Sequence, residues 1–317
     1  MRASLLSVIS LVPLAATLFA CSATDSATSP PAPRTTETTI PAGDAGGPTS
    51  GDDAGRVPSK GCSVAPVGAG SRVAKQTTAA SKKRTYHVTV PASANANANA
   101  AAAAIAPMSV VFVLHGAGNT EAESMADWYN VSATMPNALG VYPQALPRTR
   151  SDGSGGNVTR WDLSGNDDLA FFDVMLTELA DSYCVDRDRV FVTGFSSGGN
   201  FSQHLACNRH DAVKGMAVVA GPGPFSDTCN GAVPVWMTHD TGDATLPVED
   251  ARASRDFWAT ANGCTKSSWS AVPGRPECKR NTSCPSNEPL VYCETSGIGH
   301  DMPDFAIPAI GAFFSAL

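Results

Sequence analysis

The stretch Val190-Phe191-Val192-Thr193-Gly194-Phe195-Ser196-Ser197-Gly198-Gly199 decides the fold. An apolar run leads into a Gly-x-Ser-x-Gly turn, and the helix-compatible segment Asn200 to Cys207 follows the turn. A strand, a glycine-flanked turn and a helix in this order hold a serine on a strained elbow, with its hydroxyl facing a cleft. Ser196 is therefore the candidate nucleophile.

A serine hydroxyl needs a base, and the base needs a group that orients it. In the α/β-hydrolase arrangement the acid and then the histidine follow the serine along the chain, each on a loop after a strand. The loop 239–247 follows an apolar run and carries Asp243, while His300 lies on a glycine-flanked loop after the apolar run 290–293. We expect His300 to be the base and Asp243 the orienting acid. Asp240, in the same loop as Asp243, is interpreted as a turn former.

Donors for a developing oxyanion are expected at two places. The apolar run 110–114 reads as a buried strand and ends in His115-Gly116-Ala117-Gly118, so the N–H of Ala117 is one candidate. The N–H of Ser197, at the start of the helix, is the other. His115 and His239 are expected to bond to loop backbone and so to orient the site. Trp161, after a glycine-rich loop, is a candidate for stacking on an aromatic or sugar part of a substrate.

The pattern after residue 110 alternates apolar strands with helical segments, which predicts a mostly parallel central sheet covered by helices on both faces. We expect strands at 110–114, 190–193, 216–219, 233–238 and 290–293, and helices at 167–183, 200–207, 248–262 and 305–316. Right-handed crossovers then bring the loops that carry the candidate residues to one edge of the sheet. The fold class is α/β, of the α/β-hydrolase type.

Composition and the amino-terminal region limit the setting of the domain. The chain has 317 residues, 43% of them hydrophobic, and a net charge of −7, which argues against nucleic acid as a partner. Residues 1–20 are interpreted as a signal peptide, with Cys21 as a lipoprotein-type acylation site and membrane tether. Residues 21–60 read as a Pro/Thr/Ser/Gly tether and 61–317 as the catalytic domain. The Asn/Ala tract 92–106 reads as a surface loop.

Several short motifs resemble those of secreted esterases of the polyhydroxybutyrate depolymerase and feruloyl esterase type, which overlap carbohydrate esterase family one. The resemblance covers 61–317 and rests on Leu114 to Gly118, Val141 to Gln144, Asn166 to Asp168, Tyr183 to Val190, the serine elbow, His239 to Pro247, and Gly299-His300. One departure follows the histidine, where family members carry a Thr-Trp-Pro-Gly-like run and this chain has Asp301-Met302-Pro303-Asp304.

The resemblance implies a serine carboxylic ester hydrolase without metal or organic cofactor. We expect it to be a monomer, and the lipoprotein-like signal predicts that it is secreted or lipid-anchored at the bacterial cell envelope. Feruloyl or acetyl esters of plant polysaccharide are the first substrate class, and the ester backbone of polyhydroxyalkanoate is the alternative. A peptidase is a lesser alternative, because no segment here would form the gating domain of oligopeptidases of this fold. The alternative of another class is a surface lipoprotein that binds polysaccharide without turnover.

Eight cysteines remain once Cys21 is set aside, an even number that predicts four disulfides in an oxidising compartment. Eight cysteines allow 105 pairings, so the sequence alone leaves the connectivity open. The family resemblance favours Cys278 with Cys284 and Cys264 with Cys293. Pairs between Cys207 and Cys229 and between Cys62 and Cys184 would account for the rest. No C-x-x-C pair or H-E-x-x-H run suggests a metal site.

Overall fold

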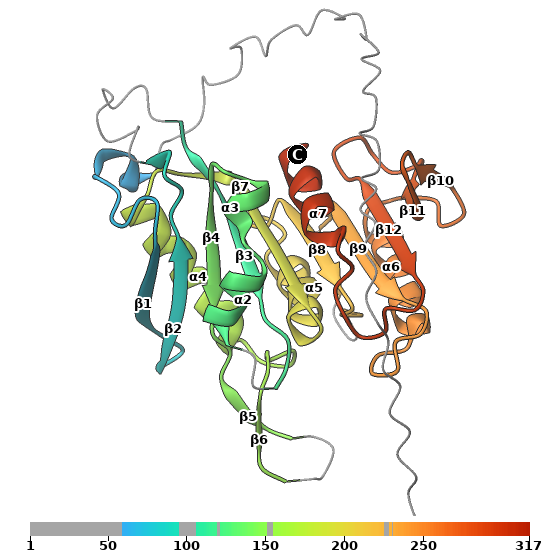
Figure 1. Ribbon diagram of the computed structural model, residues 1–317, viewed down its shortest axis with the longest axis horizontal. Helices are drawn as coiled ribbons and strands as arrows, with labels where there is room; N and C mark the ends of the chain where they lie inside the picture. The colour runs from blue at the N-terminus through green and yellow to red at the C-terminus, as the bar shows by residue number, and fades with distance from the viewer. Residues whose placement is uncertain (1–58, 95–105, 119–120, 151–154, 225–227, 230) are drawn as a thin grey trace, which may run out of the picture. The chain divides into compact units, whose positions relative to one another are not determined.

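The computed structural model describes residues 59–94, 106–118, 121–150, 155–224, 228–229 and 231–317 (Figure 1). These residues belong to the second of two units, Gly55–Leu317; the first unit, Met1–Ala54, lies outside them. The expected signal peptide, the acylation site Cys21, nearly all of the tether, and positions 95–105 of the Asn/Ala tract also lie outside the described residues.

A ten-stranded sheet runs through the described domain in the order β1-β2-β4-β3-β7-β8-β9-β12-β11-β10. The strands are β1 (Arg72–Ala79), β2 (Lys82–Thr89), β3 (Met108–Leu114), β4 (Ala138–Pro143), β7 (Val185–Phe195), β8 (Gly215–Val219), β9 (Val235–Asp240), β10 (Trp269–Val272), β11 (Arg275–Asn281) and β12 (Leu290–Thr295). The central strands from β4 to β12 pair in parallel, and two antiparallel strands extend the sheet at each end. A separate hairpin joins β5 (Pro147–Thr149) to β6 (Asn157–Thr159).

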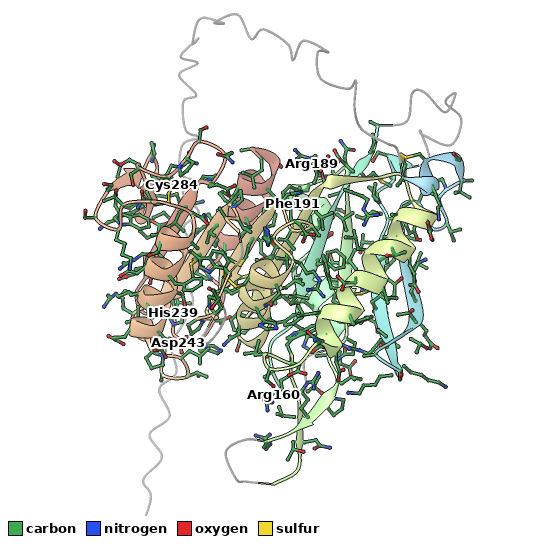
Figure 2. The ribbon with its side chains drawn as sticks, turned by 180° about the vertical axis from the view of Figure 1, so that it is seen from behind. Arg160, Arg189, Phe191, His239, Asp243 and Cys284 are labelled. Carbon is green, nitrogen blue, oxygen red and sulfur yellow. A yellow bond between two sulfur atoms is a disulfide. The ribbon has the colours of Figure 1, made fainter. Side chains whose placement is uncertain are left out.

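Helices cover both faces of this sheet (Figures 1 and 2). One face packs against α4 (Asp167–Ser182), α5 (Ser197–Asn208) and α6 (Val248–Ala261). The other packs against α2 (Ala122–Trp128), α3 (Val131–Thr134) and α7 (Ala306–Ser315). A 3₁₀ turn, η1 (Lys60–Ser63), precedes β1. The predicted fold class is confirmed: the chain has an α/β-hydrolase fold with a mostly parallel central sheet.

Burial explains why the central strands read as continuous apolar runs. Every residue of β4, β8 and β9 is buried, because helices cover these strands on both sides. The rings of Phe112 in β3 and Phe172 in α4 lie 4.8 Å apart in one of the two core layers. The outer strand β1 instead alternates exposed with half-buried positions. An edge strand of this kind lacks the apolar run by which sequence analysis finds a strand.

Four disulfides join the eight cysteines, and two of the expected pairs need correction. Cys62–Cys184 and Cys207–Cys229 are confirmed. The other two pairs are Cys264–Cys284 and Cys278–Cys293, in place of Cys278–Cys284 and Cys264–Cys293. The register of the antiparallel strands β11 and β12 is the reason, because it sets Cys278 directly opposite Cys293.

The domain begins before Gly61. The hydroxyl of Ser59 donates to the carbonyl of Tyr183 over 2.9 Å and accepts from the N–H of Val185 over 3.0 Å. Ser59 and Lys60, which the sequence places in the tether, are therefore part of the folded domain. Across the described part of the chain, no helix has the length and apolar character that crossing a bilayer requires.

Candidate active site

Ser196 lies between the end of β7 and the start of α5, in a strained backbone conformation. Its φ is 53° and its ψ is −121°, a region that side-chain-bearing residues rarely adopt. The turn is tight enough that a Cβ on Gly194 would lie 2.4 Å from the backbone of Gly198, and one on Gly198 would lie 2.1 Å from the carbonyl oxygen of Leu114. Both motif glycines are thus required sterically, and the turn lifts the serine out of the strand.

The three side chains that the sequence singles out lie in hydrogen-bond contact. Nδ1 of His300 is 2.7 Å from Oδ2 of Asp243, and Nε2 is 2.9 Å from Oγ of Ser196. With Nδ1–H donating to the carboxylate, Nε2 is left to accept the proton of the serine hydroxyl. Figure 2 shows Asp243 and His239 near the end of the domain from which Arg160 projects, away from Arg189.

Asp243 is held as a carboxylate. Its side chain is fully buried, and burial alone opposes ionisation. Hydrogen bonds from His300 and from the N–H groups of Leu246 and Thr245 outweigh burial and keep the pKa of Asp243 below its ordinary value. The buried negative charge therefore faces Nδ1 of His300 over 2.7 Å.

Asp240 has a different task from Asp243. One carboxylate oxygen accepts from the N–H of Gly242, as expected of a turn former, and the other accepts from the N–H of Ile298 over 3.0 Å. The second bond joins the loop after β9 to the loop that carries His300. His239 donates its Nε2–H to the carbonyl of Leu246, which agrees with its expected contact to loop backbone.

The two expected oxyanion donors belong to segments next to the serine: Ser197 follows it in the chain, and a Cβ on Gly116, just before Ala117, would lie 3.5 Å from that of Ser196. Ser197 is the first residue of α5, where an N–H has no acceptor within the helix. Ala117 lies on the loop after β3, and the next residue, Gly118, is fixed because its N–H donates to the carbonyl of Thr159 over 3.0 Å. Both N–H groups belong to segments anchored by neighbouring bonds.

His115 fixes the loop that carries Ala117 through two hydrogen bonds of its ring. Its Nε2 accepts from the N–H of Ala145, so the proton is assigned to Nδ1, which donates to the carbonyl of Gly116 over 2.7 Å. Burial lowers the pKa of His115 and keeps the ring neutral. His115 therefore bonds to the loop backbone, as expected.

Trp161 corrects an expectation. Its side chain is 2% exposed and stacks on Phe201, with the rings 5.1 Å apart and nearly parallel, so it offers no face to a substrate. Its indole N–H donates to the carbonyl of His115, and its backbone N–H donates to Oγ of Ser197. Trp161 therefore links the two segments that carry the expected oxyanion donors.

A buried ion cluster fixes the residue that follows Trp161. Asp168, at the start of α4, forms an ion pair with Arg84 over 2.7 Å, and its other carboxylate oxygen accepts from Arg148 over 3.1 Å and from the N–H of Asp162. The carboxylate thus ties α4, β2 and β5 to the residue that follows Trp161. Sequence reasoning noticed Asp168 only as part of a family motif; a carboxylate at a helix start carries no signal of its distant arginine partners.

The fold and this arrangement define a class of protein: an α/β-hydrolase with a serine on a nucleophile elbow, which is a carboxylic ester hydrolase. No family model matches the chain. It is 30% identical over 230 residues to feruloyl esterase D of Neurospora crassa, which covers 70% of this chain and 74% of that protein. It is 28% identical to a probable feruloyl esterase C of Aspergillus clavatus, over 61% of this chain and 69% of the relative. The chain belongs to the feruloyl esterase family.

A solved structure agrees with the fold. The acetyl xylan esterase from Aspergillus awamori superposes with a TM-score of 0.53 at 16% identity, covering 77% of this chain and 100% of that one. At this identity the likeness concerns the fold alone. Within the described residues, no group of three or more His, Cys, Asp and Glu side chains is arranged to hold a metal ion.

Proposed function

We propose that this protein hydrolyses feruloyl esters of plant polysaccharide, with Ser196 as nucleophile, His300 as base and Asp243 as the orienting acid. The observation that carries the proposal is the pair of short contacts from the two nitrogens of one imidazole, to Ser196 and to Asp243. The names of the relatives support the substrate, since they include feruloyl esterases and a bifunctional acetylxylan esterase/xylanase.

The reaction proceeds in two halves. Oγ of Ser196 attacks the ester carbonyl while its proton moves to Nε2 of His300, and the N–H groups of Ala117 and Ser197 hold the oxyanion. The C–O bond to the sugar breaks as His300 returns the proton to the departing alcohol, leaving an acyl-serine. Water then attacks the acyl carbon with His300 again as base, and the carboxylic acid leaves.

The disulfides support a location of the domain outside the cytoplasm. Four disulfides are stable in an oxidising compartment, which supports export of the domain after residues 1–20 are removed. Acylation of Cys21 would keep the exported domain at the envelope, with residues between it and Ser59 as the tether.

The test replaces single serines. Ser196→Ala should lower kcat for a simple aryl ester by at least about 10³-fold and abolish labelling by a fluorophosphonate probe. Ser202→Ala, the same change in α5 at a hydroxyl that only bonds the carbonyl of Gly198, is the matched control and should keep activity and labelling. Turnover retained in Ser196→Ala would reject the assignment.

The substrate is tested by product release. Wild type should release ferulate from feruloylated arabinoxylan and no 3-hydroxybutyrate from polyhydroxybutyrate. The opposite result would favour the depolymerase, and binding of polysaccharide without any turnover or probe labelling would favour a binding protein.

A further inference from the structure

Large apolar side chains that stay exposed in the described residues include two beside the serine. Trp128, the last residue of α2, is 45% exposed, and Ile298, two residues before His300, is 39% exposed. Tryptophan is usually well covered in a folded protein, because its ring buries more apolar surface than any other side chain. An open indole at this place therefore calls for a partner that the described residues do not supply.

Ring contacts connect Trp128 to the site. The indole meets the ring of Phe195 edge-to-face at 5.7 Å, and the ring of Phe195 lies 5.1 Å from the imidazole of His300. Phe195 is also the residue directly before Ser196 in the elbow. Trp128 and Phe195 thus form an aromatic shelf that starts at the solvent and ends at the reacting groups.

Neighbouring side chains extend the apolar character of the shelf. Met302 and Phe305, on the segment after His300, are partly buried and pack against the same core layer as Phe195. This segment is where the sequence departs from the family's Thr-Trp-Pro-Gly-like run. The segment after His300 thus contributes two partly buried apolar side chains, Met302 and Phe305, beside the exposed carboxylates of Asp301 and Asp304.

A polar groove lies at the start of α2, whereas Trp128 is the last residue of that helix. The groove, of about 440 Å³, lies beside Gly118 and is lined by Thr85, His87, Glu121, Ala122, Glu123, Gln144 and Thr159. Apart from the ring of His87 and the methyl group of Ala122, the groove is lined by hydroxyl, amide and carboxylate side chains, which suit a hydrated ligand. Among the described residues, the shelf offers an aromatic substituent of a substrate more apolar contact than this groove does.

We propose that Trp128, with Phe195 beneath it, binds the aromatic ring of a hydroxycinnamoyl acyl group and selects such esters over acetyl esters. The proposal rests on the proposed function and names the residue that sets its acyl preference. An acetyl group ends one carbon beyond the carbonyl and does not reach the shelf, whereas the vinyl spacer of a hydroxycinnamoyl group carries its ring outward. Aromatic pairs prefer the edge-to-face and offset geometries that the open indole allows.

The test compares kcat/KM for methyl ferulate with that for ethyl acetate, which has no aromatic group on either side of the ester. Trp128→Ala and Trp128→Leu should each lower the ferulate-to-acetate ratio about tenfold or more, mainly through KM for ferulate, and Trp128→Phe should keep most of it. Trp269→Ala, a tryptophan change on β10 at the far end of the sheet, should leave the ratio unchanged. The leucine and phenylalanine variants keep the measurement open if the alanine variant folds poorly.

Binding gives a second readout. Calorimetry should show that ferulate binds to the Ser196→Ala variant. The double variant with Trp128→Ala added should bind ferulate about tenfold or more weakly, like the change expected in the ratio. An unchanged ratio in the Trp128 variants would overturn the shelf while leaving the Ser196 assignment intact. If Ser196→Ala loses both activities and the Trp128 variants lower the ferulate-to-acetate ratio, the proposed function and the shelf are both supported. If Ser196→Ala retains activity, the proposed function alone is overturned.

Discussion

Ser196 carries backbone strain at the point where the chemistry is proposed. A positive φ costs a residue with a side chain about 1–3 kcal/mol, and the surrounding turn must hold it there. The carbonyl of Ser196 accepts from Asn200 and its N–H donates to Val219, so the strained residue is fixed from both sides. Strain at this single residue exposes the hydroxyl, because a relaxed strand would direct it into the sheet.

The strain predicts a difference between two inactive variants. Ser196→Gly should be more stable than Ser196→Ala by about 1 kcal/mol, because glycine adopts the positive φ freely and the strain relieved exceeds its extra chain entropy. Urea unfolding measures both. Ser197 is the matched control: it is the first helical residue of α5, so Ser197→Gly should be less stable than Ser197→Ala. The same sign at both positions would contradict the strain argument.

At the scale of elements, the loops that follow β9 and β12 act as one unit. Asp240 accepts from Ile298, and Asp243 accepts from His300, so two carboxylates three positions apart in the chain hold one loop. Asp240 is 2% exposed and its pKa is lowered: burial opposes ionisation, and hydrogen bonds from Ile298, Gly242 and Gly299 outweigh it. The strand ends thereby fix where the imidazole lies.

The lowered pKa of Asp240 predicts a pH dependence. A carboxyl whose folded pKa lies below its unfolded value stabilises the fold above about pH 4 and loses that contribution as pH falls through the folded pKa. Asp240→Asn should therefore be less stable than wild type by about 1–3 kcal/mol at pH 6, and the gap should narrow at pH 3. Urea unfolding at both pH values checks this, with the exposed Asp304→Asn as control. A gap that stays constant would contradict the carboxylate's role.

At the scale of the whole molecule, sequence analysis finds the buried half of the architecture. The central strands β3, β7, β8, β9 and β12 and the helices α4 to α7 are predictable because burial on both faces produces continuous apolar runs, and the serine, aspartate and histidine loops follow from strand order. The central strand β4 and the short helices α2 and α3 are not among the expected elements. The outer strands β1, β10 and β11 are missed because they have no such run, as the sequence Arg-Pro-Glu-Cys-Lys-Arg-Asn of β11 shows. The burial of Trp161 and the exposure of Trp128 depend on which neighbouring residues cover each indole. A single sequence does not show which residues those are.

Disulfide connectivity belongs to this scale as well, because it is set by strand register and by distant chain segments. Cys278–Cys293 spans 15 residues within one hairpin, whereas Cys62–Cys184 spans 122 and fastens η1 beside the start of β7. A cross-link that closes a longer loop removes more entropy from the unfolded chain. The long link therefore stabilises the domain more than the short one does.

Paired variants put the two links in order. On the chain-entropy account, removing the 15-residue link by Cys278→Ala with Cys293→Ala costs about 3 kcal/mol, and removing the long link by Cys62→Ala with Cys184→Ala costs nearly 5 kcal/mol. All four cysteines are buried, so the two double variants lose comparable packing. Urea unfolding of both under oxidising conditions gives the difference directly. A larger loss for the hairpin pair would mean that native contacts around β11 and β12, and not constraint of the unfolded chain, determine what these disulfides contribute.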